Sequence, residues 1–447
     1  MMTRLHHYWQ EICSSFWFVP AAIVLAAVGL ATVLIAVDAT FTEVARWPLL
    51  FGAGAAGSRG LLTAVASSMI TVAGVVFSIT IVALSLTSSQ YTSRVLRNFM
   101  RDRVNQVVLG LFVGVFAYCL VVLRTIRGGD EGAFVPSLAV LTGLSLAFVG
   151  IAGLIYFIHH ISMSIQASTI IAAVAQETNA AVDHLFPEEL GKHADEDTGG
   201  YLDMPLLEQA WSAVSANETG YIESIDQDAL LAFARGHGTI LRMERAIGEF
   251  VAAGTPLVSV VDSGGLDDET TAELNAVYVL SRQRTVQQDV AFGIRQIVDI
   301  ALKALSPGIN DTTTAAMCVD YLAAILVRIA VRRMPTSHRL DQGVLRVIAR
   351  GPSFESLLAE AFDQIRQNAA GNVAILSRML GAIQTIASLT TSPGRRAALR
   401  EQVQSIAELA GRTVKSPYDR ARFESRLVRV HESLEAEPVL FVRAKKD

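Results

Sequence analysis

A row of hydroxyl side chains runs along one of the most apolar segments of the chain, Leu61–Thr87. With Gly74, its members fall within roughly 60° of one another on a helix of 100° per residue. Such a row lines a water-filled path when several copies of a membrane helix surround an axis. It serves equally as a packing surface, with each hydroxyl bonded to the carbonyl one turn back. The candidate pore-lining residues are Ser67, Thr71, Ser78, Ser85 and Ser89.

A second polar group lies in the C-terminal half, where the spacing predicts an amphipathic helix over Thr285–Leu305. This helix stops at Ser306-Pro307-Gly308, and a new helix begins behind an Asn-Asp pair with three threonines. A helix N-terminus rich in hydroxyls can hold an anion. A solvated ion-paired face and a simple cap explain the same residues. The candidates for a ligand site or an interface are Arg295, Asp299, Asn310, Asp311 and Thr312.

The sequence contains no familiar catalytic or cofactor motif. There is no G-x-x-x-x-G-K-[ST] loop, no H-E-x-x-H, no C-x-x-C and no G-x-S-x-G elbow. Three widely spaced cysteines suggest no metal site, and the adjacent His159 and His160 point about 100° apart on a helix. No lysine lies between Lys192 and Lys303, which excludes a lysine-attached carrier in that stretch. We therefore expect no enzyme activity, no cofactor and no metal.

Composition indicates how these residues are positioned. The 447-residue chain is 51% hydrophobic and 18% charged, with a net charge of −5, and this mild acidity does not suggest a nucleic-acid binder. The apolar excess lies before about residue 160. Four runs there reach the roughly 20 residues that a helix needs to cross a bilayer. They are Phe16–Val37, Leu61–Thr87, Val104–Leu123 and Phe134–Ile158.

Arginines set the expected orientation of these spans. Arg94, Arg97, Arg101 and Arg103 lie between the second and third spans, and basic loops stay on the cytoplasmic side. An even number of spans then places both termini in the cytoplasm. No Asp, Glu, Lys or His lies within a span, which argues against an ion-coupled transporter. Glycines in the third and fourth spans predict close helix packing within the bundle; they are Gly110, Gly114, Gly143, Gly150 and Gly153.

The chain beyond the spans has the composition of a soluble protein. A connecting helix and linker (161–200) lead to a small β-rich module (201–264), in which Gly248–Leu257 resembles the turn of biotinyl/lipoyl barrel-sandwich modules. From about Leu266 the patterns are helical almost to the end (265–447). Beyond the two helices already described, they predict Ser353–Gln367, Val373–Ser388, Pro393–Ala410 and Tyr418–Leu434. The fold expected is a four-helix transmembrane bundle, residues 1–160, with a cytoplasmic α+β domain.

Two stretches resemble the domain-of-unknown-function 2254 family of predicted bacterial membrane proteins. The first contains Gly74, Phe77-Ser78-Ile79, Gln90-Tyr91 and Arg94. The second runs from Gln288-Asp289-Val290-Ala291-Phe292-Gly293 through Asp299 to Ala304-Leu305-Ser306-Pro307-Gly308-Ile309-Asn310-Asp311, with Thr314-Ala315. The resemblance covers nearly the whole chain. It implies a multi-pass protein of the bacterial inner membrane and brings no catalytic residues.

Three classes of function follow from these patterns. The first is a homo-oligomeric channel or pore with a cytoplasmic regulatory domain. The second is a non-catalytic membrane scaffold or sensor whose soluble domain binds a partner or a small ligand. The third is an enzyme of unrecognised type. The lipid bilayer and further copies of the same chain are the expected partners, and nothing in the sequence identifies a soluble one.

Overall fold

The computed structural model describes residues 17–40, 54–90, 102–128, 134–186, 210–261 and 267–436. The chain divides into two compact units, Met1–Ile170 and Ile171–Asp447. The predicted linker at 191–200 and most of the arginine-rich loop before Asp102 lie outside the described residues.

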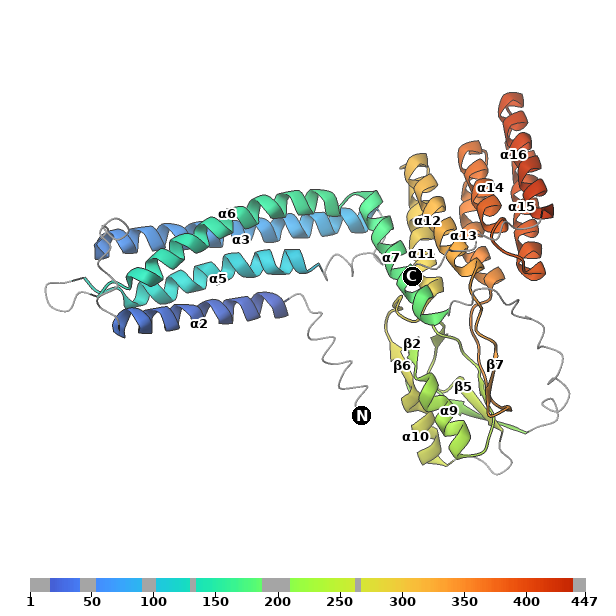
Figure 1. The fold of residues 1–447 in the computed structure, drawn as a ribbon, viewed down its shortest axis with the longest axis horizontal. Helices are drawn as coiled ribbons and strands as arrows, with labels where there is room; N and C mark the ends of the chain where they lie inside the picture. Colours follow the sequence, from blue (N-terminus) through green and yellow to red (C-terminus); the bar gives the residue numbers. More distant parts are fainter. Residues whose placement is uncertain are drawn as a thin grey trace, which may run out of the picture. The chain divides into compact units, whose positions relative to one another are not determined.

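In the first unit, long apolar helices run side by side (Figure 1). Each is 23 residues or longer, which is enough to cross a bilayer. The 36 residues of α3 extend about 54 Å at 1.5 Å per residue, well beyond a hydrocarbon core of about 30 Å. The helices are α2 (Phe18–Thr40), α3 (Ala55–Gln90), α5 (Arg103–Thr125) and α6 (Ser137–Ser164).

The glycines bring these helices together as predicted. A Cβ added to Gly110 would lie 2.9 Å from the Cα of Pro20 on α2. One added to Gly143 of α6 would lie 2.8 Å from Leu62 on α3. Helix α5 packs against α2, α3 and α6, so it is the central helix of the unit. The Asp38 carboxylate at the end of α2 accepts hydrogen bonds from the backbone N–H groups of Leu138 and Ala139 at the start of α6.

A fifth helix, α12 (Thr312–Ala330), also has the length and apolar composition of a span, although the sequence placed it in the soluble part. It belongs to the second unit, where it packs against α11 (Val290–Leu305) and α14 (Val373–Ala387). Its buried side chains include Leu322, Ile325 and Leu326. Length and composition therefore identify five candidate spans and do not by themselves fix the number at four.

Two sheets form the β part of the second unit. The larger has the order β1-β5-β3-β8-β7, antiparallel except between β3 and β8, and the smaller has the order β4-β2-β6. Helices α9 (Gln227–Gly236) and α10 (Asp268–Val277) belong to the same part. The strands are β1 (Trp211–Ser215), β2 (Gly220–Ile225), β3 (Leu241–Met243), β4 (Phe250–Val251), β5 (Pro256–Val261), β6 (Tyr278–Ser281), β7 (His338–Asp341) and β8 (Val344–Ile348).

The expectation of helix from Leu266 almost to the end is wrong at β6, β7 and β8. These strands are only four or five residues long. Strands β6 and β8 pair with strands that lie 50 or more residues earlier, as in the pairing of Leu241 with Val347, and such pairing leaves no local period in the sequence. Strand β7 joins the larger sheet through an antiparallel hairpin with β8. The glycines of the predicted β-turn do take positive φ, 84° at Gly248 and 82° at Gly254.

The remaining helices form a bundle around α11, α12 and α14. The predicted helix over Thr285–Leu305 begins later, at Val290, because Asp289 caps it by accepting from the N–H of Phe292. The other four helix predictions are confirmed to within a few residues. The helices are α13 (Phe354–Asn368), α14, α15 (Pro393–Thr413) and α16 (Pro417–Glu435).

Candidate functional site

Helix α7 (Ala167–Leu185) is the covalent link between the two units. Only Ile165 and Gln166 separate its start from the end of α6. The boundary between the units falls after Ile170, within α7. A displacement of the membrane helices can reach the second unit through the backbone only along this helix, so the residues that hold α7 are the first candidates for a functional site.

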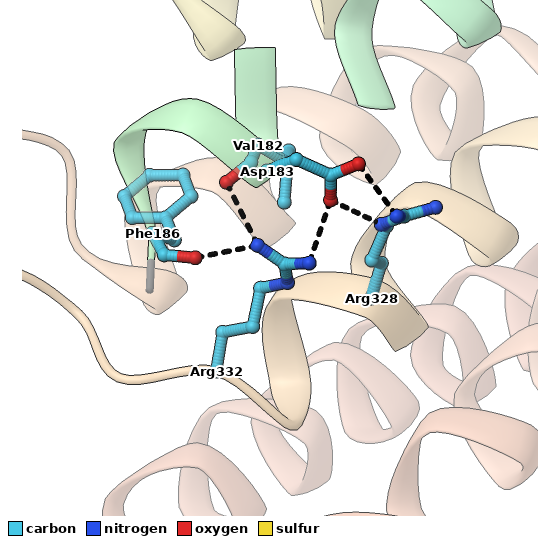
Figure 2. Close-up of polar contacts among 5 residues, drawn as sticks. All are labelled: Val182, Asp183, Phe186, Arg328 and Arg332. Atoms are coloured by element: carbon cyan, nitrogen blue, oxygen red, sulfur yellow. Dashed lines mark hydrogen bonds and ion pairs between the residues drawn. The ribbon is translucent and has the colours of Figure 1, made fainter. Parts of the chain in front are cut away.

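Two arginines bind the C-terminal end of α7, as Figure 2 shows: Arg328 lies in α12, and Arg332 follows it. The Asp183 carboxylate accepts hydrogen bonds from two nitrogens of Arg328, from Nε to Oδ1 at 2.7 Å and from Nη2 to Oδ2 at 2.6 Å. Arg332 donates from Nη2 to the same carboxylate at 2.6 Å. Its Nη1 donates to the backbone carbonyls of Val182 (3.2 Å) and Phe186 (2.5 Å). We call Asp183, Arg328 and Arg332 the α7 clamp.

The two arginines of the α7 clamp differ in burial. The side chain of Arg332 is 4% exposed, whereas those of Arg328 and Asp183 are each 43% exposed. A guanidinium at a helix C-terminus meets the partial negative charge of the last carbonyls. Arg332 therefore acts as a buried C-terminal cap of α7, and Arg328 adds a bidentate pair on the surface.

A glycine lets α7 approach α11 closely. A Cβ added to Gly293 would lie 2.9 Å from the Cβ of Thr178, a separation that real Cβ atoms do not reach. Thr178 is fully buried, and its hydroxyl donates to the carbonyl of Val174 at 2.7 Å. Glycine at position 293 therefore leaves the space that Thr178 occupies.

The rest of the Gln288–Gly293 motif ties α11 to the β part. The Gln288 Oε1 accepts from the N–H of Ile225 on β2 at 3.2 Å. Asp289, which is 6% exposed, caps α11 and also accepts from Arg284 Nε at 2.8 Å. A Cβ at Gly248 would collide with this pair, lying 2.8 Å from Nη2 of Arg284. The motif therefore joins β2, the Gly248 turn, α7 and α11.

Of the sequence candidates, Arg295 and Asp299 form an internal network. Arg295 pairs with Asp299 along α11 at 2.9 Å and reaches Glu360 and Gln364 on α13 at 3.4 and 3.0 Å. Both side chains are partly buried, 25% and 15% exposed. Their contacts link α11 to α13 and explain both residues without a ligand.

Asn310, Asp311 and Thr312 shape the turn between α11 and α12. Asn310 adopts a left-handed conformation (φ 50°), which asparagine tolerates better than most residues. Asp311 caps α12, accepting from the Thr314 hydroxyl at 2.6 Å and its N–H at 3.0 Å, and these bonds lower the pKa of Asp311. The Thr312 hydroxyl accepts from the Asn372 amide at 3.3 Å. The three residues lie together, and capping and turn formation account for them.

The hydroxyl row of α3 faces away from its own bundle. Ser67, Thr71, Ser78 and Ser85 are all exposed, and Thr71 donates to the Ser67 carbonyl at 2.8 Å. The side chain of Ser89 lies outside the described part of the chain. The buried face of α3 lies roughly 160° away around the helix. Its members include Leu62, Ala66, Met69, Ala73, Val76 and Ala83. The row therefore does not pack inside the bundle of one chain.

Sequence reasoning missed the α7 clamp. Arg328 and Arg332 are spaced by four residues at the end of an apolar helix, a pattern that could have marked them as a pair on one face. Asp183, however, precedes them by 145 residues or more, and no local pattern connects it to them.

Known proteins that resemble this chain identify its family. The family model described as "Predicted membrane protein (DUF2254)" matches residues 13–385. The chain belongs to this family. An uncharacterized protein of Mycobacterium tuberculosis (strain CDC 1551 / Oshkosh) is 36% identical over 397 residues, 87% of this chain and 74% of the relative. One of Mycobacterium bovis is 35% identical over the same length and shares. No solved structure matches the chain at a significant level. The DUF2254 match ends within α14, so α15 and α16 lie beyond it.

Proposed function

We propose that this protein is a homo-oligomer of the bacterial cytoplasmic membrane in which α3 helices from several copies surround a water-accessible path. Each chain crosses the membrane four times, through α2, α3, α5 and α6. Both termini are cytoplasmic, and the second unit is a cytoplasmic regulatory domain that α7 connects to the spans. The single observation that supports a path is the outward direction of the hydroxyl row on α3.

The outward direction matters because the free face of a membrane helix can contact lipid, water or another copy of the chain. Hydroxyls that face lipid gain nothing beyond the bond to their own helix, as Thr71 makes to Ser67. Hydroxyls that face water or another copy gain further hydrogen bonds. The opposite face of α3 is already used within the chain, where Leu62 meets Gly143 and Met69 meets Gly150. The row is thus the part of α3 that a second copy or a water path would use.

In this proposal α12 lies outside the membrane. Its apolar side chains are buried by α11 and α14 in the second unit, so they need no lipid to cover them. Arg328 near its end pairs with Asp183, and Asp320 pairs with Arg378 of α14. Ion pairs of this kind are typical of a helix with one face in water.

Cysteine accessibility tests the proposal. In a chain lacking Cys13, Cys119 and Cys318, single cysteines replace Ser67, Thr71, Ser78 or Ser85, and Val76→Cys on the buried face is the control. A path predicts reaction of the row, but not of Val76→Cys, with a charged, membrane-impermeant thiol reagent, and a loss of ion flux through reconstituted protein after labelling. Contact between copies without a path predicts disulfide formation across copies and no flux. Protection of the whole row, without cross-links and without flux, would replace the channel with the scaffold interpretation.

A further inference from the structure

The first turn of α5 carries a buried amide that finds no partner. Asn105 is 1% exposed, and neither Nδ2 nor Oδ1 of its side chain has a hydrogen-bond partner in the part of the chain that the structure describes. An unpaired buried amide costs on the order of 1–3 kcal/mol even in a soluble protein. In a lipid-embedded bundle, no solvent replaces the missing bonds. A partner outside the described chain would remove this cost.

Polar groups one turn away connect Asn105 to the end of the bundle. Asp102 caps α5 by accepting from the N–H of Val104 at 2.9 Å. Its other carboxylate oxygen lies 2.5 Å from Nε2 of His160 on α6, and the hydroxyl of Ser164 lies 3.3 Å from the same nitrogen. The side chains of His160 and Asp102 are 24% and 18% exposed. The pair is thus partly open to its surroundings, while Asn105 lies wholly inside.

The antiparallel packing of α5 and α6 places Asn105 inward of that pair. Gly150 of α6 lies against Phe112, and Gly143 lies against Tyr118, so α6 runs backwards along α5 from His160 at the Asp102 end. Asn105 is one helical turn from Asp102 in the direction of Phe112. The Asp102–His160 pair therefore sits between the buried amide and the end of the bundle.

We propose that Asn105 binds internal water at this end of each bundle, beneath the Asp102–His160 pair. Water is the ligand that fits, because it both accepts from Nδ2 and donates to Oδ1, and buried waters typically make about three hydrogen bonds to polar groups of this kind. A second copy of the chain cannot supply the partner, since the amide is covered by its own bundle. The proposal rests on the proposed membrane placement of α5, which puts the Asp102 end at the cytoplasmic side.

A structure of the full-length protein in nanodiscs, at a resolution that shows ordered water, tests the proposal directly. We expect density within hydrogen-bond distance of both amide atoms of Asn105 that no protein atom accounts for. An empty site, or a protein group hydrogen-bonded to the amide, overturns the proposal.

The sign of a stability change gives an independent test. Asn105→Leu keeps a four-atom side chain branched at Cγ, but its larger methyl groups displace the water and its bonds, so a hydrated site predicts a lower melting temperature. An unpaired amide predicts the opposite, because leucine removes a polar group that was buried without compensation. An unchanged or raised melting temperature therefore overturns the proposal. Val108→Asn places an amide at a buried position one turn further along α5. The fall in melting temperature of this variant gives the cost of a buried amide that has no water. The proposed path along α3 is tested separately, by cysteine labelling at positions such as Ser78 on the outer face. The water site and the path can therefore fail independently of each other.

Discussion

Replacing Arg332 with alanine is expected to release the C-terminal end of α7. The buried guanidinium donates to the carbonyls of Val182 and Phe186 and to the carboxylate of Asp183. After truncation the Val182 carbonyl still accepts from the N–H of Phe186 at 2.9 Å, whereas the Phe186 carbonyl loses the donor described for it, and a buried unpaired group costs about 1–3 kcal/mol. Asp183 keeps Arg328 and stays partly solvated. We therefore expect Arg332→Ala to lower the free energy of unfolding of the second unit by about 1–3 kcal/mol, the cost of one buried carbonyl that loses its donor.

Arg328→Ala is the matched control, because it removes the exposed arginine of the same clamp. Exposed ion pairs contribute about 0.2–1 kcal/mol, so this variant should change stability by less than about 1 kcal/mol. Hydrogen exchange of the full-length protein provides the assay, with peptides that cover α7 compared between variants. Protection in the last turns of α7 should fall sharply in Arg332→Ala and little in Arg328→Ala. Equal effects of the two variants would show that Arg332 is not the cap of α7.

Three other predictions follow from the described contacts. Gly293→Ala should destabilise the second unit by about 1–3 kcal/mol through overpacking against Thr178, and thermal unfolding should show partial recovery when Thr178→Ala is added; full stability of Gly293→Ala alone would contradict the close approach. The lowered pKa of Asp311 stabilises the fold above the ordinary carboxyl pKa, and this stability is lost as pH falls through the lowered value; Asp311→Asn keeps a capping side chain but should flatten that acid limb of the stability curve, and an unchanged limb would argue against the linkage. A reporter fused after Asp447 should report the cytoplasmic side and one fused near Asp130 the external side, and the reverse result would refute the proposed topology.

The sequence was sufficient where a local period determines structure. Helices α13 to α16 follow apolar spacing, and the long helices of the first unit follow unbroken apolar runs. Single residues provide helix caps, such as Ser353 at the start of α13 and Asp311 at the start of α12. Glycine spacing also predicted close packing within the bundle, which Gly110 confirms for α5 against α2, and Gly143 and Gly150 confirm for α6 against α3. In each case the information lies within one continuous segment of the chain.

What the sequence could not supply depends on residues far apart in the chain. The pairing of β3 with β8 joins positions separated by more than 100 residues, and the two strands are too short to show alternation. The sequence also could not show which way the hydroxyl row faces, because a row of small residues can face either the bundle or its surroundings. Only the packing of Leu62 and Met69 against α6 shows that the row faces outward.

Arg332 of the α7 clamp is one of several buried arginines that hold helix ends. Arg395 of α15 donates from Nη1 to the carbonyl of Ala330 at 2.8 Å and from Nη2 to that of Arg332 at 3.0 Å. The residue that caps α7 is therefore itself held at its carbonyl by a second arginine. Because one backbone position carries both contacts, a shift of α7 that pulls on Arg332 also changes the position of the acceptor of Arg395.

This arrangement gives the proposed regulatory role a physical route. Arg396, next to Arg395, donates to the carbonyls of Leu434 and Ala436 at the end of α16. Arg332, which follows α12, thus holds the end of α7, and Arg395 and Arg396 of α15 hold the ends of α12 and α16. Helices α15 and α16 lie beyond the part of the chain that the family model matches. Residues that contact each other in one hydrogen-bond network, as Arg395 contacts the carbonyl of Arg332, give non-additive energies. If the ends move together, Arg332→Ala and Arg395→Ala should show a coupling energy on the order of 0.5–3 kcal/mol in a double-mutant cycle, whereas helix ends that are held independently would give additive losses.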